Sequence, residues 1–174
     1  MKTMNRIVVI LALLSLSATN SFSQNKDAAK TLPKDVPMTL HATGAFDAKT
    51  TPLPADDATG GAAVNISRYA LDKQYHGDLE GTSKGEMLGS GDPSKGNAGY
   101  VAVEKVTGTL HGRSGSFALQ HSGMMEQGKF QLAVNVVPGS GTGGFAGIAG
   151  TMTIIITNGK HSYNFEYTLP EKSE

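Results

Sequence analysis

A thirteen-residue pattern occurs twice in this chain, and it constrains the fold more than any other feature. Residues 107–119 align without a gap with residues 142–154. Both copies read Thr-Gly-x-apolar-x-Gly-x-small-Gly-hydroxyl-apolar-x-aliphatic. Three glycines at set places, followed by alternating residues, indicate a strand, a glycine-cornered turn and a second strand. Two copies are fewer than the three or so that a solenoid needs, so we expect two equivalent hairpins in one barrel.

The N-terminus has the features of a secretory signal. Two basic residues precede an apolar run at residues 7–18, which is too short to span a bilayer comfortably. The Ser-Phe-Ser at residues 21–23 fits the small-x-small rule for cleavage. Residues 1–23 are therefore predicted to be a helical signal peptide cleaved after Ser23, with an uncleaved anchor as the alternative. The mature protein is expected to be exported, to the periplasm or beyond the cell.

Composition excludes several classes of function. The chain has no cysteine, which excludes disulfides, thiol chemistry and a lipid-modified cysteine anchor. It carries 15 basic and 15 acidic residues, and loss of the two basic residues of the signal leaves a net charge of −2. Without a basic cluster, we expect no nucleic-acid binding and no polybasic attraction to anionic lipid.

The rest of the chain divides into a polar leader at residues 24–37, a β domain at residues 38–169 and a short tail at residues 170–174. Eight strand-like runs lie at residues 38–48, 66–75, 79–90, 99–110, 114–124, 130–137, 147–157 and 161–169. Turns between them are predicted at Asn158-Gly159, the strongest signal, and at Gly112-Arg113 and Gln127-Gly128. Residues 51–61 are predicted to be a surface loop. Eight strands with glycine turns favour an antiparallel sandwich or barrel.

A family resemblance favours the barrel. The glycine corner at residues 141–150 resembles a motif of allene oxide cyclases and dirigent proteins. The wider chain is similar to an uncharacterised bacterial family grouped with them, domain of unknown function three-two-two-four. The similarity is carried by Gly77–Ser83, Gly99–Gly108, Gly112–Phe117, Gln120–Gly123 and Val137–Gly143. It implies an all-β fold with a single eight-stranded antiparallel β-barrel of the allene oxide cyclase-like type. It brings no established activity, and no catalytic residue is carried over from the cyclases.

A transmembrane barrel is the structural alternative. The chain has no Trp and only 6% aromatic residues, whereas a lipid-facing barrel needs aromatic girdles at both interfaces. We therefore expect no membrane insertion once the signal is removed.

Two short motifs are better explained by strands than by active sites. Residues 81–85 match Gly-x-Ser-x-Gly, but strand-like sequence follows where a nucleophile elbow needs a helix. Residues 139–144 match Gly-x-Gly-x-x-Gly, again without the helix that would hold a pyrophosphate. The five histidines have no metal-binding spacing. We therefore expect no cofactor and no metal site.

His121 is the most informative polar residue, because it shares a strand face with Phe117 and Leu119. At the repeat offset it corresponds to Ile156, an aliphatic core position, where a histidine needs a partner. It is either a core histidine bonded to a neighbouring strand or a group that lines a cavity. Glu104 is either solvated on the outer face or buried with a displaced pKa.

Three functions remain open. The barrel could bind one small apolar or amphipathic molecule, could act on it as an isomerase or cyclase, or could be a non-catalytic module that self-associates as a homo-oligomer. In the second case Glu104 and His121 are the candidate catalytic residues. The predicted ligand-binding residues are Tyr100, Glu104, Phe117, His121, Tyr163, Phe165 and Tyr167.

Overall fold

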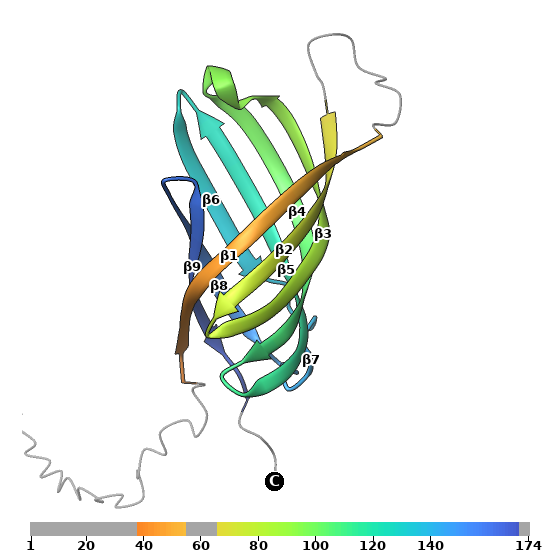
Figure 1. Ribbon diagram of the computed structural model, residues 1–174, viewed down its shortest axis with the longest axis vertical. Coiled ribbons are helices and arrows are strands. Elements are labelled where there is room, and N and C mark those ends of the chain that lie inside the picture. Colours follow the sequence, from red (N-terminus) through yellow and green to blue (C-terminus); the bar gives the residue numbers. More distant parts are fainter. Residues whose placement is uncertain (1–37, 55–65, 171–174) are drawn as a thin grey trace, which may run out of the picture. The chain divides into compact units, whose positions relative to one another are not determined.

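A computed structural model describes residues 38–54 and 66–170, so the predicted signal peptide and leader lie outside the described residues. Eight antiparallel strands close into a barrel, β1-β2-β3-β4-β5-β6-β8-β9, as Figure 1 shows. Their bounds are β1 (Leu40–Leu53), β2 (Ile66–Gly77), β3 (Leu79–Asp92), β4 (Asn97–Leu110), β5 (Arg113–Glu126), β6 (Lys129–Val136), β8 (Ala149–Thr157) and β9 (Lys160–Thr168). A two-residue strand, β7 (Thr142–Gly143), adds to β5, and a 3-10 turn, η1 (Pro93–Lys95), joins β3 to β4. The predicted all-β barrel is confirmed, and no helix in the described residues is long and apolar enough to span a membrane.

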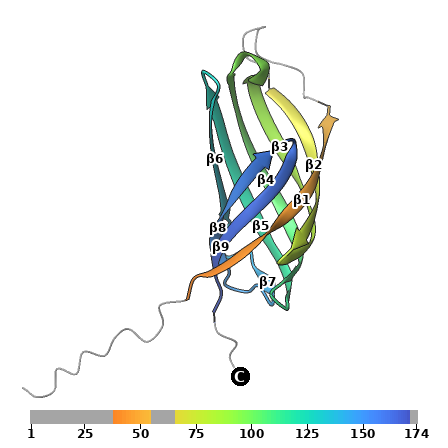
Figure 2. The same cartoon turned by 60° about the vertical axis from the view of Figure 1, so that its left-hand side comes forward.

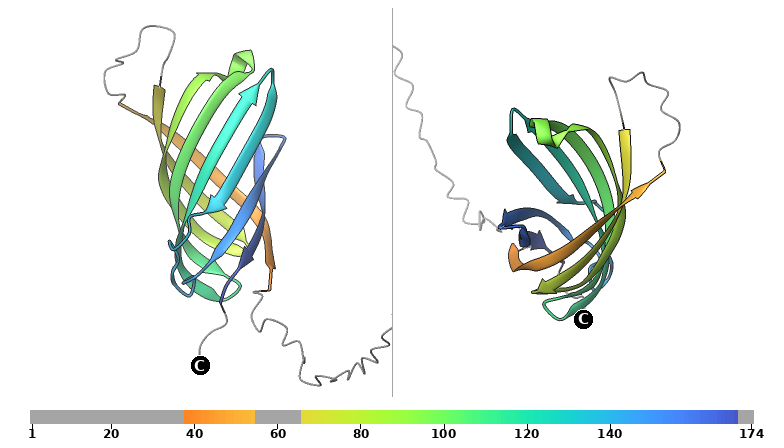
Figure 3. Two further views of the ribbon diagram at one scale, coloured as in Figure 1. Left: turned by 180° about the vertical axis from the view of Figure 1, so that it is seen from behind. Right: turned by 45° about the horizontal axis from the view of Figure 1, so that its top comes forward.

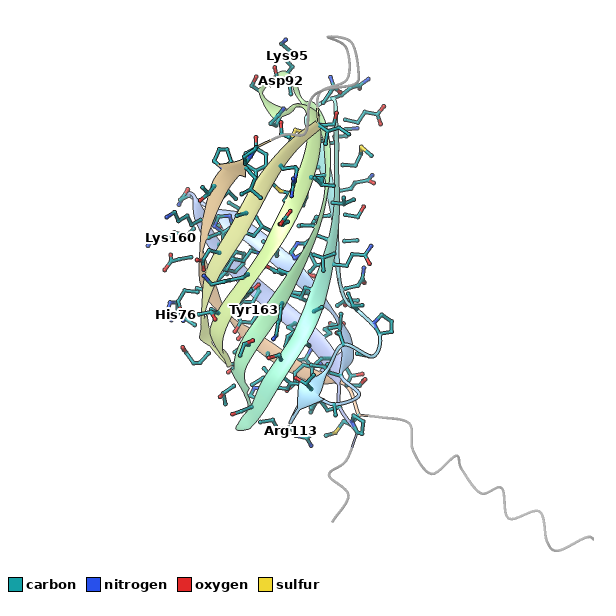
Figure 4. All side chains as sticks on the ribbon, turned by 90° about the vertical axis from the view of Figure 1, so that its right-hand side faces the viewer. His76, Asp92, Lys95, Arg113, Lys160 and Tyr163 are labelled. Atoms are coloured by element: carbon teal, nitrogen blue, oxygen red, sulfur yellow. The ribbon has the colours of Figure 1, made fainter. Side chains whose placement is uncertain are left out.

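The two ends of the barrel are built differently. Figure 4 shows Arg113 at the lower end, beside the β4–β5 turn, and Asp92 and Lys95 at the upper end, beside η1. The strands of the β8–β9 hairpin have nine residues each, against fourteen in β1, and the hairpin closes only the lower part of the wall (Figures 2 and 3). Its ladder with β1 ends at Phe46↔His161, although β1 continues to Leu53.

The strand β1 corrects one sequence prediction. Residues 51–53, predicted to begin a surface loop, continue the strand, and Pro52 pairs with Tyr69 of β2. Proline has no N–H to donate, so within a strand it is found at positions where the backbone nitrogen faces away from any neighbouring strand. Pro52 lies above the end of the β9 ladder, where this edge of β1 has no neighbouring strand among the described residues. The rest of the predicted loop, residues 55–61, lies outside the described residues.

Three hairpin turns use a non-glycine residue followed by glycine. His111, Gln127 and Asn158 have φ values of 46°, 50° and 53°, and each precedes a glycine with positive φ. Two consecutive positive φ values are the requirement of the tight turn that matches strand twist. The turns predicted at Asn158-Gly159 and Gln127-Gly128 are confirmed. The turn predicted at Gly112-Arg113 lies one residue earlier, at His111-Gly112, because Arg113 already pairs with Leu110.

The two copies of the thirteen-residue pattern do not form equivalent hairpins, so that prediction is wrong. The first copy is the β4–β5 hairpin. In the second copy β7 pairs with β5, through Gly115↔Gly143, rather than with β8. The chain then turns at residues 144–147, and the Phe145 side chain packs edge-on against Phe117 at 5.4 Å between ring centroids. Burial of the Phe145 ring favours a segment that closes the lower end of the barrel, rather than a second hairpin.

Three glycines of the pattern, together with Gly81, form a row across neighbouring strands. Gly81 pairs with Gly108, Gly108 with Gly115, and Gly115 with Gly143. A Cβ at Gly108 would collide with the Glu80 carbonyl oxygen, and one at Gly115 with that of Thr142. Strands approach this closely only where side chains are absent, and such positions let a sheet bend sharply. The row therefore marks where the strands of the lower end approach one another most closely.

The lower interior is a packed apolar core. Alternate residues of every long strand point inward, and those of the lower half are buried. Phe165 stacks on Phe117 and on Tyr167, with centroid distances of 5.7 and 5.0 Å. Side-chain hydrogen bonds tie this end together, including Tyr167 Oη with His111 Nδ1 at 2.8 Å and Leu79 N to Tyr163 Oη at 2.9 Å. The lower half is therefore a packed core held together by ring contacts and hydrogen bonds.

Candidate functional site

Five polar side chains converge inside the barrel, above the apolar core; they are Lys73 and Tyr75 of β2, Ser83 of β3, Glu104 of β4 and His121 of β5. We call them the Glu104 cluster. Glu104 is at the centre, and its side chain has no exposed surface. Its Oε1 accepts hydrogen bonds from Lys73 Nζ at 2.8 Å, Tyr75 Oη at 3.1 Å and His121 Nε2 at 3.0 Å. Its Oε2 accepts one from Ser83 Oγ at 2.8 Å.

The strand register brings these residues together. Lys73 pairs directly with Ser83. Both side chains point inward, as the alternation of these buried residues with exposed neighbours shows. His121 pairs with Ala102, one inward position above Glu104 on β4. Gly85 pairs with Glu104, and a Cβ at Gly85 would lie 2.7 Å from the Glu104 Cβ. The missing side chain at Gly85 therefore leaves the carboxylate the space to turn toward its partners.

The electrostatics of the Glu104 cluster favour an ionised carboxylate. Burial alone would raise the pKa of Glu104, but hydrogen bonds from His121 and Lys73 and the charge of Lys73 outweigh it and lower the pKa to about 2. Burial and the Glu104 charge together raise the pKa of Tyr75 well above its usual value, so its hydroxyl stays protonated and donates. Because Glu104 only accepts, Nε2 of His121 carries the proton of their hydrogen bond.

Two groups of the cluster keep unused hydrogen-bonding capacity. With Nε2 protonated, a neutral His121 has an acceptor lone pair on Nδ1, and no described residue bonds to it. Every fully buried side-chain nitrogen and oxygen of the described residues has a partner, so Nδ1 borders accessible space. Lys73 uses one N–H on Glu104, and its Nζ lies 5.1 Å from the Phe46 ring centroid, in cation–π contact. Its other N–H groups have no hydrogen-bond acceptor among the described residues.

Above the cluster, the barrel interior is accessible to solvent. Inward positions of β1 beyond Phe46 are exposed, as are Phe130 of β6 (48%) and Ile156 of β8 (61%). Lower inward residues of the same strands, such as Val134 and Met152, are buried. The Tyr100 ring lies over Gly123 and stacks on Phe130 at 6.4 Å, which forms part of the apolar wall. The site is thus a charged floor beneath an open and largely apolar space.

The structure divides the seven residues predicted to bind a ligand into two groups. Glu104 and His121 meet in the cluster, and Tyr100 lies above them. Phe117, Phe165 and Tyr167 belong to the packed lower core, and so does Tyr163, labelled in Figure 4, whose hydroxyl caps the β2–β3 turn. Only the first group therefore borders the open part of the barrel, and the site proposed below does not use the second.

Sequence reasoning missed Lys73, Tyr75 and Ser83. The signal for Lys73 was present, because it alternates with Leu71 and Tyr75 on one strand face, as His121 does with Phe117 and Leu119. Ser83 lies within the Gly-x-Ser-x-Gly match, and β3 continues through it as a strand, so the expectation that it is no nucleophile elbow is confirmed.

Other features of the described residues are weaker candidates. A shallow depression of about 240 Å³ lies over the outer face of the β5–β6 hairpin, lined by Met124, Glu126, Gln127, Lys129 and Gln131. All five side chains are exposed, so no buried polar group faces it. Within residues 38–54 and 66–170, no three His, Asp or Glu side chains converge as metal ligands would.

Comparisons with known proteins identify relatives without an assigned activity. A family model described as "protein of unknown function (DUF3224)" matches residues 42–167. A crystal structure of a protein with unknown function from the DUF3224 family of Shewanella oneidensis MR-1 is 50% identical in sequence. The match has a TM-score of 0.71 and covers 77% of this chain and 100% of that one. No curated protein matches the chain.

Proposed function

This chain belongs to the DUF3224 family, and we propose that its barrel binds one small apolar or amphipathic molecule in the upper interior. The observation that carries the proposal is the position of the Glu104 cluster. Buried charge is costly unless every group is bonded, and a protein that needed only stability would do as well with apolar residues there. Here the cluster forms the floor of an apolar space and leaves His121 Nδ1 and N–H groups of Lys73 unused. Apolar walls with a few polar groups are typical of ligand sites.

The charge balance of the cluster favours an uncharged polar group on the ligand. Lys73 and Glu104 form an ion pair at 2.8 Å, so the charges of these two groups already balance. A hydroxyl fits this floor, because it can donate to His121 Nδ1 and accept from Lys73 Nζ. A carboxylate or an ammonium would add an unpaired charge to a low-dielectric site.

The test is native mass spectrometry of purified residues 24–174, followed by organic extraction of any bound species. We expect an adduct in the small-lipid mass range, which His121→Ala and Lys73→Met weaken. Phe117→Leu, in the packed lower core, is the control and should keep the adduct. A clean apo mass, together with no binding of uncharged amphiphiles added afterwards, would favour the non-catalytic interaction module.

A second candidate function is proton transfer on the bound molecule, and one contact favours it. Glu104 accepts the hydrogen bond from Nε2 of His121, which orients the ring and leaves Nδ1 as the proton acceptor. In this case His121→Ala should abolish turnover while the adduct persists. Loss of the adduct without any turnover by the parent protein would identify a carrier.

We also propose that the protein is exported and that its signal peptide is cleaved after Ser23. The basic start, the apolar run at residues 7–18 and the small-x-small site support this. Intact mass of the protein recovered from the periplasm and the medium tests it, and a chain that begins at Gln24 is expected. Full-length protein retained in the membrane would favour the uncleaved anchor.

A further inference from the structure

The wall of the barrel has one weak seam, between β6 and β8. Their ladder consists of a single residue pair, Asn135↔Thr151. On its other side β6 pairs with β5 along its whole length, and β8 pairs with β9 along its whole length. Above Asn135 and Thr151 the two strands therefore diverge, as Figure 3 shows. We call the space between them, from residues 129–134 of β6 to residues 152–157 of β8, the lateral opening.

The lateral opening is bordered by apolar side chains that face the barrel interior. Phe130 and Leu132 lie on the inward face of β6, and Ile154 and Ile156 lie on that of β8. Phe130 and Ile156 are among the most exposed large apolar side chains of the described residues, at 48% and 61%. An apolar surface of this kind at the mouth of an interior is typical of a binding groove.

The opening leads directly to the Glu104 cluster. Leu132 is followed two residues later by Val134, which pairs with His121. On the other flank of His121 lies Ala102, one inward position above Glu104. The lower end of a molecule lying between β6 and β8 would thus come beside His121, which shares Glu104 Oε1 with Lys73. The opening spans six residues of each strand, about 20 Å at roughly 3.3 Å per residue.

From these observations we propose that the lateral opening admits, from the side, and then holds the alkyl chain of an elongated amphiphile whose hydroxyl or other uncharged polar group reaches His121 and Lys73. This rests on the proposed ligand-binding function and adds the ligand class and its route. A compact ring compound would leave most of the strip formed by Phe130, Leu132, Ile154 and Ile156 uncovered. A long chain covers the strip along its length.

The first test is a homologous series of 1-alkanols from hexanol to hexadecanol, measured by displacement of the uncharged dye N-phenyl-1-naphthylamine. Affinity should rise roughly two- to fourfold per added methylene until the chain fills the opening. If neither the dye nor any alkanol binds, the proposed function itself fails. If they bind but affinity stops rising at the shortest alcohols, the elongated ligand is excluded and the binding function stands.

The second test blocks the opening with a label on an introduced cysteine. Because the chain has no native cysteine, the label attaches at that position alone. Ile156→Cys, at the edge of the opening, is labelled with a bulky, charged maleimide. Val101→Cys, on the outer face of β4 and 51% exposed, is the matched control. The label at residue 156 should slow dye association at least tenfold, and the label at residue 101 should not. Equal rates would show that the ligand enters elsewhere and would overturn the proposal.

The same labelled samples also show whether the label unfolds the barrel and whether the protein is an oligomer. If circular dichroism shows that the label at residue 156 unfolds the barrel, Phe130→Cys on the opposite edge replaces it, with the same expectation. Native mass spectrometry of the parent protein and of the labelled variant shows the oligomeric state. A parent dimer that the label converts to a monomer would assign the opening to strand pairing between copies and would overturn the proposal.

Discussion

Glu104 shows how one buried charge can organise an interior. Four donors saturate its carboxylate, so it is a poor proton acceptor and a good anchor for its neighbours. The sequence alone does not decide whether Glu104 faces the interior or solvent, because both faces of its strand mix apolar and charged residues. The partner that resolves the ambiguity, Lys73, lies 31 residues away on another strand. Alternation within a strand predicts a facing direction, but pairing across strands depends on register, which a single sequence does not contain.

A double-mutant cycle tests the Lys73–Glu104 pair. Lys73→Met leaves a carboxylate buried beside its remaining donors, and it should lower the free energy of unfolding by about 3–5 kcal/mol. Adding Glu104→Gln should recover part of this loss, because the uncompensated charge is then gone. The control is Lys84→Met, since Lys84 and Asp72 form an exposed pair and its loss should cost about 0.5 kcal/mol or less. Urea unfolding of the wild type, the two single variants Lys73→Met and Glu104→Gln and the double variant gives the four values of the cycle, and additive costs would contradict the coupling.

The lowered pKa of Glu104 predicts acid sensitivity. Its pKa is about 2 in the folded chain and near 4.5 when unfolded, so the unfolded state binds the proton more readily. The stabilisation is complete above about pH 4.5 and is lost as the pH falls toward 2, by about 3 kcal/mol in total. The pKa values of Asp78 and Asp92 are also lowered, so they add to the same trend. Carbon-13 NMR of the glutamate carboxyls isolates Glu104, and a titration midpoint above pH 4 would refute the assignment.

At the scale of elements, strands were more predictable than the closure of the barrel. Alternation located eight strands, and the resemblance to a barrel family supplied their arrangement. The second copy of the pattern does not form the predicted hairpin, although its local sequence is compatible with one. The buried contact of Phe145 with Phe117 favours the observed turn, and this contact depends on tertiary structure. The glycines have two different roles, close approach of strands and positive φ in turns, and spacing alone does not separate them.

Two glycine substitutions should separate these roles. Gly108→Ala puts a methyl group against the Glu80 carbonyl and the Gly81 backbone, so it should cost about 3 kcal/mol by overpacking. Gly159→Ala, in the β8–β9 turn at φ 75°, meets nothing within 4 Å and should cost about 1 kcal/mol of backbone strain. Thermal and urea unfolding of both variants measure the difference. Equal costs would mean that the row of glycines is not a site of close strand approach.

As a whole molecule, the barrel is a rigid lower half that supports a partly open upper half. The lower half has stacked rings, buried apolar side chains and side-chain bonds that tie the turns to the strands. In the upper half β1 and β6 each have a neighbouring strand on one side only among the described residues. A binding site at the junction has a fixed floor and walls that can adapt, which suits a ligand with one defined polar contact and a variable chain.

This division predicts an alternating pattern of amide exchange. The hydrogen bond from Val137 N to Ala118 O sets the register of β6, so the odd-numbered amides bond to β5 and the amides of Phe130 and Leu132 face the lateral opening. Hydrogen exchange followed by NMR should therefore find Gln131 and Ala133 protected and Phe130 and Leu132 exchanging at least about tenfold faster. Addition of 1-hexadecanol should leave the alternation in place and slow exchange throughout the upper strands, because the ligand stabilises the folded barrel. Uniform protection of β6 in the free protein would mean that β8 pairs with it in solution. The barrel would then have no lateral opening, and a ligand could reach the Glu104 cluster only through its upper end.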